Sequence, residues 1–240
     1  MYNYNTFKNN IDEIRLEDRF VINTINQYSF ILAEKDLLFK EALVNSDILL
    51  ADGVGITFAE LFLNGQKIKK IAGSDVHTHL LKQVELKKGK VFYIGSTTDT
   101  MLRVTNRITD ENPGIKHVGF ICPPFADEMD LATTESIIEK VNRFAPDLLV
   151  VAMSAPKQEK WVFVNEHRLN TTTICCIGAA VDFFAHYNRP NKIFINIGIE
   201  WLIRLCREPN RLAKRYVIGG PIFIAKIIKF KFRKKLRAKT

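Results

Sequence analysis

The sequence has 240 residues, of which 47% are hydrophobic and 25% charged, and this balance suits a soluble globular protein with a sizeable core. No apolar run approaches the roughly 20 residues that cross a bilayer, and the polar first residues do not predict a signal peptide. The four cysteines have no metal-ligand spacing, which argues against a structural zinc. We therefore expect a cytoplasmic protein without a transmembrane helix.

The net charge of +9 is unevenly distributed along the chain. Residues 201–240 contain thirteen Lys or Arg and one acid, Glu208, so this segment carries +12 and the preceding 200 residues carry about −3. Such asymmetry indicates an anionic partner for the C-terminal segment, either a membrane surface or a nucleic acid.

Short apolar runs alternate with longer segments of helical periodicity over most of the chain. Strands are predicted at residues 20–25, 47–51, 91–94, 117–121, 148–152 and 173–177. Helices are predicted at residues 29–45, 56–63, 76–86, 99–109, 130–143, 157–169, 179–185 and 193–206, with residues 73–75 as the turn and N-cap before 76. This alternation is typical of βαβ units, so we expect an α/β fold with a doubly wound, mainly parallel, Rossmann-like sheet.

The pattern changes after Gly178, and we expect an α/β catalytic domain over 1–190 and a helical, membrane-associating appendage over 191–240. From Ile222 onward, a helical wheel separates basic from apolar side chains. The basic side holds Lys226, Lys229, Arg233 and Arg237, and the apolar side holds Ile224, Ile227 and Ile228. Such a helix either lies in a membrane interface or packs its apolar side on the sheet domain.

The predicted strand at 148–152 leads into a tight turn and then a helix. Pro156 suits the start of that helix, because a missing N–H has no cost there. Lys157, Gln158 and Glu159 would then open the helix at the carboxyl end of a parallel strand, where open α/β sheets bind ligands. A routine strand-to-helix turn explains the same residues equally well.

Asp52 directly follows a predicted strand, and Gly53 and Gly55 behind it would let the backbone approach a ligand closely. A partly desolvated carboxylate at such a strand end can act as a general base. The alternative is that Asp52 only caps the next helix. Thr24 and Asn26 end the first strand, where their side chains either bind a sugar hydroxyl or fix a turn.

Gly178 and the two alanines after it open a helix behind another predicted strand. A helix N-terminus attracts phosphate through its N–H groups and its dipole. Asp182, in the first turn, either holds a ribose or sugar hydroxyl or only complements the dipole. The chain has no D-x-D pair that would chelate a metal–nucleotide, and we expect no metal and no cofactor.

Together these stretches resemble the WecG/TagA/CpsF family of bacterial glycosyltransferases, and their order and spacing are specific. The resemblance extends from about Phe20 to Tyr216. The segments that carry it are 24–26 (TIN), 51–55 (ADGVG), 72–75 (AGSD), 93–95 (YIG), 123–125 (PPF), 155–159 (APKQE), 178–184 (GAAVDFF) and 200–205 (EWLIRL).

The resemblance implies an inverting, metal-independent hexosyltransferase, peripheral on the inner face of the cell membrane. It would move a sugar from a UDP-sugar to a polyprenyl-diphosphate-linked saccharide in cell-surface polysaccharide synthesis. TagA-like members transfer N-acetylmannosamine to N-acetylglucosaminyl-diphospho-undecaprenol for wall teichoic acid. WecG-like members transfer N-acetylmannosaminuronic acid, and CpsF-like members serve capsule or exopolysaccharide synthesis. Relatives also imply self-association into a homo-oligomer.

The resemblance also assigns roles by position. Asp52 matches the family's catalytic base. The residues that match substrate-binding positions are Thr24, Asn26 and Gln158 for the sugars, Lys70 for the diphosphate, and Arg204, Arg211 and Lys214 in the C-terminal appendage. The nucleotide end would comprise Gly95, Pro156, Lys157, Gly178 and Asp182.

The chain departs from the family pattern at four of these or neighbouring positions. Lys70 and Lys214 replace Arg, and Ser154 and His186 replace Gly. Because Lys cannot make the bidentate contact of a guanidinium with phosphate, the donor sugar stays open. A UDP-glucose or UDP-glucuronate-type transferase is the alternative enzyme. Two non-enzymatic hypotheses are a nucleic-acid-binding module, for which no recognised motif is present, and a nucleotide-sugar sensor without turnover.

Overall fold

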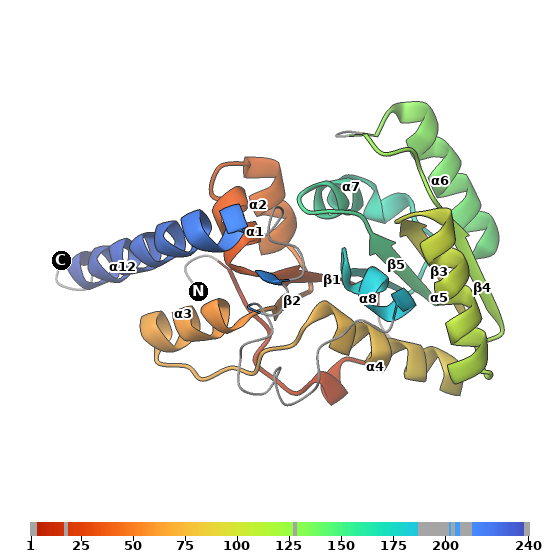
Figure 1. Cartoon of the computed structure of the whole chain (residues 1–240), viewed down its shortest axis with the longest axis horizontal. Coiled ribbons are helices and arrows are strands. Elements are labelled where there is room, and N and C mark those ends of the chain that lie inside the picture. The colour runs from red at the N-terminus through yellow and green to blue at the C-terminus, as the bar shows by residue number, and fades with distance from the viewer. Residues whose placement is uncertain are drawn as a thin grey trace.

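The computed structural model describes residues 4–16, 19–126, 129–186, 202, 205–206 and 213–237. Its centre is a six-stranded sheet in the order β2-β1-β6-β5-β3-β4, and every pair of neighbouring strands is parallel (Figure 1). The strands are β1 (Phe20–Ile25), β2 (Ile48–Ala51), β3 (Lys90–Gly95), β4 (His117–Ile121), β5 (Leu148–Ala152) and β6 (Thr173–Cys176). The predicted α/β, Rossmann-like sheet is therefore confirmed, and each predicted strand agrees within one residue at either end.

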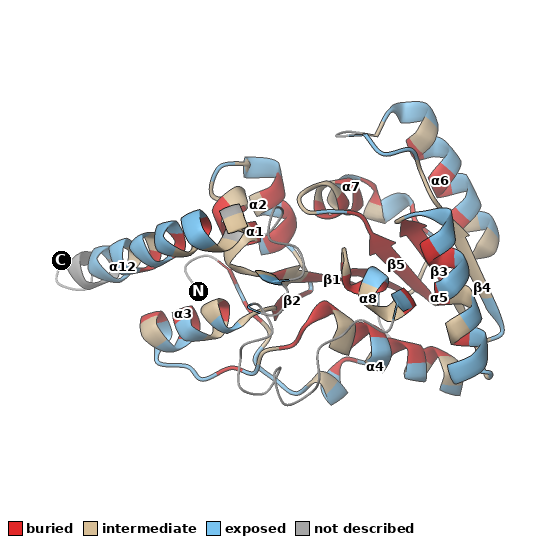
Figure 2. Cartoon of the chain, viewed as in Figure 1, coloured by how far each residue is buried: buried red, intermediate tan, exposed pale blue. Residues whose placement is uncertain are grey.

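Most strands form because their residues are apolar on both faces of the sheet. Every residue of β2, β5 and β6 is buried, as expected for parallel strands that helices cover on both sides. The edge strand β4 is only half-buried along most of its length. Figure 2 shows this gradient, with red strands at the centre and a paler β4 at the edge.

Helices cover both faces of the sheet. One core cluster lies between the sheet and α4 (Gly73–Leu86), α5 (Thr98–Glu111) and α8 (Ala180–His186). A second lies between the opposite face and α6 (Leu131–Phe144) and α7 (Lys157–Asn165). A third, beside β2, is enclosed by α1 (Gln27–Ala33), α2 (Leu37–Val44), α3 (Val54–Asn64) and α12 (Gly219–Arg237). Shorter turns are 3₁₀ helices at Ile11–Glu13 and Glu166–Arg168 and a π-helical turn at Lys214–Ile218.

The single helix predicted over 29–45 is wrong, because a break separates α1 from α2. The Asp36 carboxylate accepts the backbone N–H of Phe39 at 3.0 Å and so caps a new helix. Asp36 also accepts a hydrogen bond from the ammonium of Lys160 on α7 at 3.0 Å. These contacts, with the Phe39 N–H first, lower the pKa of Asp36. Apolar periodicity runs through the break and therefore concealed the cap.

Two other helix boundaries differ from the prediction by three residues or more. Helix α4 begins at Gly73 with Ala72 as its N-cap, and Asp75 accepts the Ala72 N–H at 3.2 Å from inside the first turn. Helix α7 ends at Asn165, and the chain continues as the 3₁₀ turn Glu166–Arg168. At α4 a polar contact, rather than the hydrophobic pattern, sets the boundary. The predicted helix 193–206 and the predicted boundary at residue 190 fall largely outside the described residues.

Helix α12 packs against the body of the protein along one line of side chains. Phe223 and Ile227 are each only 2% exposed, and the rings of Phe223 and Phe230 lie edge-on to Phe30 of α1 at 5.4 and 6.2 Å between centroids. The adjacent Ile224, by contrast, is 53% exposed. The line of side chains through Phe223 therefore packs on the body of the protein, which was one of the two predictions for this helix. The line through Ile224 remains on the surface.

This arrangement predicts opposite outcomes for two adjacent substitutions. Phe223→Ala should lower the free energy of unfolding by roughly 3–5 kcal/mol, because it leaves a cavity beside Phe30. Ile224→Ala, one residue away on the exposed side, should change it by less than about 0.5 kcal/mol. Chemical denaturation of both variants measures the difference. Equal effects at the two positions would show that α12 does not pack through Phe223.

Candidate functional site

The strand register brings the carboxyl ends of the central strands to one level. Ile25 of β1 pairs with Ala51 of β2, and Gly95 of β3 pairs with Ala152 of β5. Strand β6 lies between β1 and β5, and its pairing carries the same level across to Gly178. The residues just behind the strands, where most of the predicted site residues lie, therefore share one edge of the sheet.

The connections diverge at this edge between β3 and β5. From β5 the chain returns to the neighbouring β6, and from β3 it continues outward to β4 (Figure 1). Open α/β sheets bind ligands at such a reversal. Gly95 has a φ of +111°, and a Cβ there would lie 2.5 Å from the carbonyl oxygen of Ala152. Glycine is thus needed where these two strand ends meet.

Asp52 lies at the β2 end of this edge and is half-buried. Its backbone N–H donates to the carbonyl of Ile25 at 2.9 Å, which fixes it beside the end of β1. The N–H of Ile71 donates to the carbonyl of Ala51 at 3.0 Å, so the backbone of Lys70 lies next to Asp52. Asp52, Thr24 and Lys70 are therefore brought together.

Asn26, next to Thr24, has a structural role at the start of α1. Its Oδ1 accepts the backbone N–H groups of Tyr28 and Ser29, each at 3.0 Å, and the Ser29 hydroxyl accepts the Asn26 N–H at 2.8 Å. This reciprocal capping box agrees with the second of the two predictions for Asn26, that its side chain fixes a turn. A role for Asn26 with sugars stays a prediction.

The glycines after Asp52 accommodate a side chain that the sequence did not single out. Gly53 has a φ of +115° and precedes α3. A Cβ on Gly55 would lie 2.2 Å from Nε2 of Gln27, so Gly55 makes room for the Gln27 amide. Gln27 immediately follows Asn26, and that proximity is the only sequence signal for its place beside Asp52.

Gln158 connects the two helices behind β5 and β6. Its Oε1 accepts the N–H of Gly178 at 3.1 Å, and its Nε2 donates to Oε1 of Glu159 at 2.8 Å. Gly178 has a φ of +52°, which a glycine adopts without strain. The Gly178 N–H, predicted to receive phosphate, is thus engaged with Gln158 in this structure.

Glu159 is a buried acid whose burial the sequence did not predict. It is 1% exposed, and its Oε2 has no hydrogen-bond partner. Burial raises its pKa to about 7, against the smaller opposing effect of the hydrogen bond from Gln158. The polar residues Lys157, Gln158 and Glu159 at the start of a helix gave no sign of this burial, because acids in the first turn are usually solvated.

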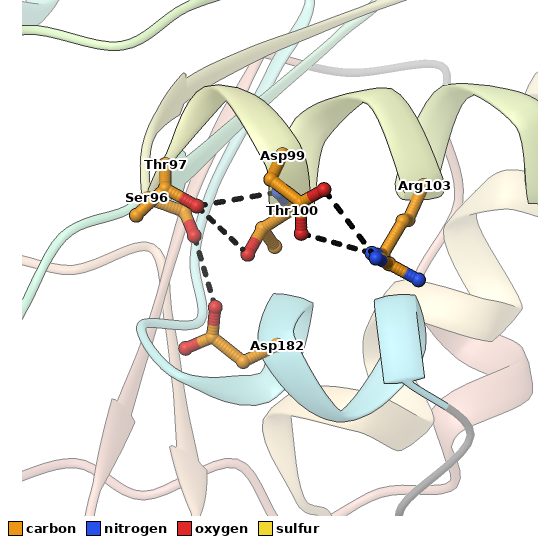
Figure 3. Close-up of polar contacts among 6 residues, drawn as sticks. All are labelled: Ser96, Thr97, Asp99, Thr100, Arg103 and Asp182. Atoms are coloured by element: carbon orange, nitrogen blue, oxygen red, sulfur yellow. Dashed lines mark hydrogen bonds and ion pairs between the residues drawn. The ribbon is translucent and has the colours of Figure 1, made fainter.

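The predicted nucleotide end is shown in Figure 3. The Ser96 hydroxyl, behind β3, donates to Oδ1 of Asp182 on α8 at 2.9 Å. Asp99 pairs with Arg103 on α5, Oδ2 to Nε at 2.9 Å, and this pair lowers the pKa of Asp99. Ser96, not singled out in the sequence, therefore joins Asp182 at the β3 end of the edge.

Five predicted residues remain, two at the start of α7 and three in the C-terminal segment. Pro156 is the N-cap of α7, and the Lys157 ammonium donates to the carbonyl of Ala126 in the loop behind β4 at 2.6 Å. Arg204 and Arg211 lie outside the described residues. Lys214 begins the π-helical turn Lys214–Ile218, but its side chain is not among those described.

The described part of the chain shows neither a cluster of metal ligands nor a helix suited to span a membrane. Within residues 4–16, 19–126, 129–186 and 213–237, no group of three His, Cys, Asp or Glu side chains is placed to hold a metal ion. In the same described residues, no helix combines the length and the hydrophobicity that a membrane span requires.

The sequence model of a protein family, described as "Glycosyl transferase WecG/TagA/CpsF family", matches residues 2–237. The chain belongs to this family. It is 28% identical over 216 residues to an N-acetylglucosaminyldiphosphoundecaprenol N-acetyl-beta-D-mannosaminyltransferase of Bacillus subtilis, covering 90% of this chain and 81% of that protein. It is 29% identical over 205 residues to the protein of the same name from Staphylococcus aureus, covering 84% and 76%. The resemblance seen in the motifs is thus confirmed.

The buried Glu159 predicts a stability that depends on pH. Its pKa is raised from 4.5 to about 7 in the folded protein, so the folded state binds the extra proton and loses stability as the pH rises through this window. Relative to Glu159→Gln, which stays neutral, the free energy of unfolding of the unmodified protein should fall by on the order of 3 kcal/mol by pH 8.

Urea denaturation of both proteins at a series of pH values measures this effect. Glu41→Gln, on the exposed side of α2, is the matched control and should follow the unmodified protein. Parallel stability curves for Glu159→Gln and the unmodified protein would mean that Glu159 is ionised in the folded state over the whole range.

Proposed function

We propose that this family member transfers an N-acetylmannosamine-type sugar, with inversion, from a UDP-sugar to a polyprenyl-diphosphate-linked saccharide. Support for the sugar and the acceptor comes from the names of the B. subtilis and S. aureus relatives. Support for the UDP-sugar comes from the family resemblance and from the polar edge of the sheet. The reaction belongs to the synthesis of a cell-surface polysaccharide.

The observation that carries the proposal is the common edge that holds both Asp52 and Asp182. Strands β2 and β6 are separated by β1 alone, so Asp52 lies roughly 10 Å along the edge from the residues behind β6. A nucleotide sugar laid along this edge has its nucleotide near Asp182 and Ser96 and its sugar near Asp52. The acceptor hydroxyl then approaches from the β2 side.

The chemistry is a single displacement at the anomeric carbon. Asp52 takes the proton of the acceptor hydroxyl as that oxygen attacks, and the bond from the anomeric carbon to the UDP oxygen breaks with its electron pair going to UDP. Attack from the face opposite to UDP inverts the configuration. The cationic side chains proposed to stabilise the leaving diphosphate without a metal are Lys70, Arg204, Arg211 and Lys214.

The acceptor also explains the basic C-terminal segment. A polyprenyl chain stays in the bilayer, so the enzyme must work at its surface, and each Lys or Arg near an anionic leaflet contributes about 1 kcal/mol to attachment. We infer a peripheral location on the inner face of the membrane, with residues 191–240 as the membrane-associating appendage. The basic segment thus serves the acceptor rather than a nucleic acid.

Asp52→Asn tests the proposed base. The amide keeps the shape of the side chain but cannot take the proton, so kcat should fall roughly 10²–10⁴-fold with the fold intact. Transfer is measured by mass spectrometry of the lipid product, with a panel of UDP-sugars and a synthetic lipid-diphosphate N-acetylglucosamine.

Asp110→Asn is the matched control, because Asp110 is exposed near the C-terminal end of α5, away from this edge. It should retain full activity. Full activity in Asp52→Asn would remove Asp52 as the base, and UDP binding without turnover for any donor would favour a sensor.

A further inference from the structure

The outer face of α3 is apolar, although it is exposed. Val54, Phe58 and Leu61 follow one another at helical spacing, and Phe58 and Leu61 are 57% and 51% exposed. The Phe58 ring stacks on that of Phe62 with 5.9 Å between centroids. The one acid of this helix, Glu60, is buried and accepts a hydrogen bond from the Thr6 hydroxyl at 2.9 Å. The face that α3 presents to solvent therefore carries no charge.

Helix α12 presents a second exposed apolar line, next to the line that packs on α1. Ile224, Ile228 and Phe232 recur every four residues, and all three are exposed. Among the described residues, seven of the eighteen exposed large apolar side chains lie on α3 and α12. Exposed apolar surface is thus concentrated on these two helices.

The two helices are in direct contact through Lys231. Its ammonium donates to the carbonyl of Phe62 at 2.6 Å and lies 4.0 Å from the centre of the Phe62 ring. Both helices project from the β2 end of the molecule (Figure 1), and their exposed outer residues are visible there in Figure 2. Their apolar lines therefore lie on two helices that are in contact.

Basic side chains follow α3 in the chain and also lie on α12. Lys67 and Lys69 are exposed just behind α3, and Lys229 and Arg233 are exposed on α12. The last acid in the chain is Glu208, before α12 begins. Exposed Phe, Ile and Leu side chains bordered by Lys and Arg are the chemistry that binds an anionic lipid interface.

We propose that α3 and α12 form one membrane-docking face, in which Phe58 and Leu61 of α3 insert between anionic lipid headgroups beside Ile224 and Ile228 of α12. This inference deepens the peripheral attachment of the proposed function by adding an anchor from the catalytic part of the chain. Helix α3 begins two residues after Asp52, so docking α3 holds Asp52 at the bilayer surface. The lipid-linked acceptor then needs to rise only a short way out of the membrane.

Binding to vesicles tests the docking face directly. The unmodified protein should bind vesicles of equimolar phosphatidylglycerol and phosphatidylcholine, and bind phosphatidylcholine vesicles much more weakly. Phe58→Ser with Leu61→Ser should weaken binding to the anionic vesicles tenfold or more, because two apolar side chains no longer leave water. Leu102→Ser, at a 52% exposed site on α5, is the matched control and should bind as the unmodified protein does.

A second variant keeps the test independent of any loss of folding. Phe58→Trp retains a large apolar ring, so it should bind normally, and its fluorescence should shift to shorter wavelength when anionic vesicles are added. Unchanged vesicle binding by the Phe58→Ser, Leu61→Ser double variant would overturn the proposal. Loss of self-association in that variant with vesicle binding intact would also overturn it, and would assign the face to a second copy of the chain.

Activity separates this inference from the proposed function. With acceptor embedded in vesicles, the double variant should turn over more slowly, whereas with a short-chain, water-soluble acceptor it should match the unmodified protein. Equal slowing with both acceptors would contradict docking by α3. Absence of transfer by the unmodified protein with either acceptor would instead refute the proposed reaction, while vesicle binding would still decide the docking face.

Discussion

The parallel register of the sheet is the constraint on which the rest of the structure depends. Pairing between β1, β2, β6, β5 and β3 places their carboxyl ends at one level, and a shift of one residue in any pair would move each side chain of the shifted strand to the opposite face of the sheet. These strands are mostly apolar on both faces, so burial of their side chains adds to the hydrogen bonds of the ladders in holding them in place. The polar residues just behind them are therefore delivered to one edge without contributing to the core.

Much of the sheet could be predicted from sequence because the signal is local. A run such as Leu148–Ala152 is too short for a globular helix and too apolar for a loop, so its identity as a buried strand follows from the residues themselves. The break at Asp36 could not be predicted in this way. It depends on a cap to Phe39 and a contact with Lys160, which is 124 residues distant in the sequence.

The candidate site was partly predictable for the same reason. Asp52, Ser96 and Gly178 follow apolar runs, so their place at the sheet edge could be inferred. The partners of Ser96 and Gln27, by contrast, come from distant segments. The burial of Glu159 was also hidden, because it depends on how α7 lies on the sheet. The helical wheel grouped Ile224, Ile227 and Ile228 on one side of α12, but of these only Ile227 is buried. The line that packs inward is the one that reaches Phe30 of α1, which the sequence of α12 alone does not specify.

Helix α12 shows how one segment can stabilise the fold and also present a surface. Phe223 and Ile227 fill the cluster beside β2, which fixes the helix, and the next line of side chains is then held outward at a defined angle. Through Lys231 this helix reaches α3, the helix that begins just after Asp52. The exposed side chains of α12 are thus linked, through α3, to the sheet edge at which Asp52 lies.

The most direct measurement of the site is a crystal structure of the protein with UDP bound. We expect the ribose within hydrogen-bond distance of Asp182, the diphosphate between the Ser96 turn and Gly178, and the terminal phosphate directed along the edge toward Asp52. UDP bound away from the carboxyl ends of β3, β5 and β6, or with its diphosphate directed away from Asp52, would contradict the site.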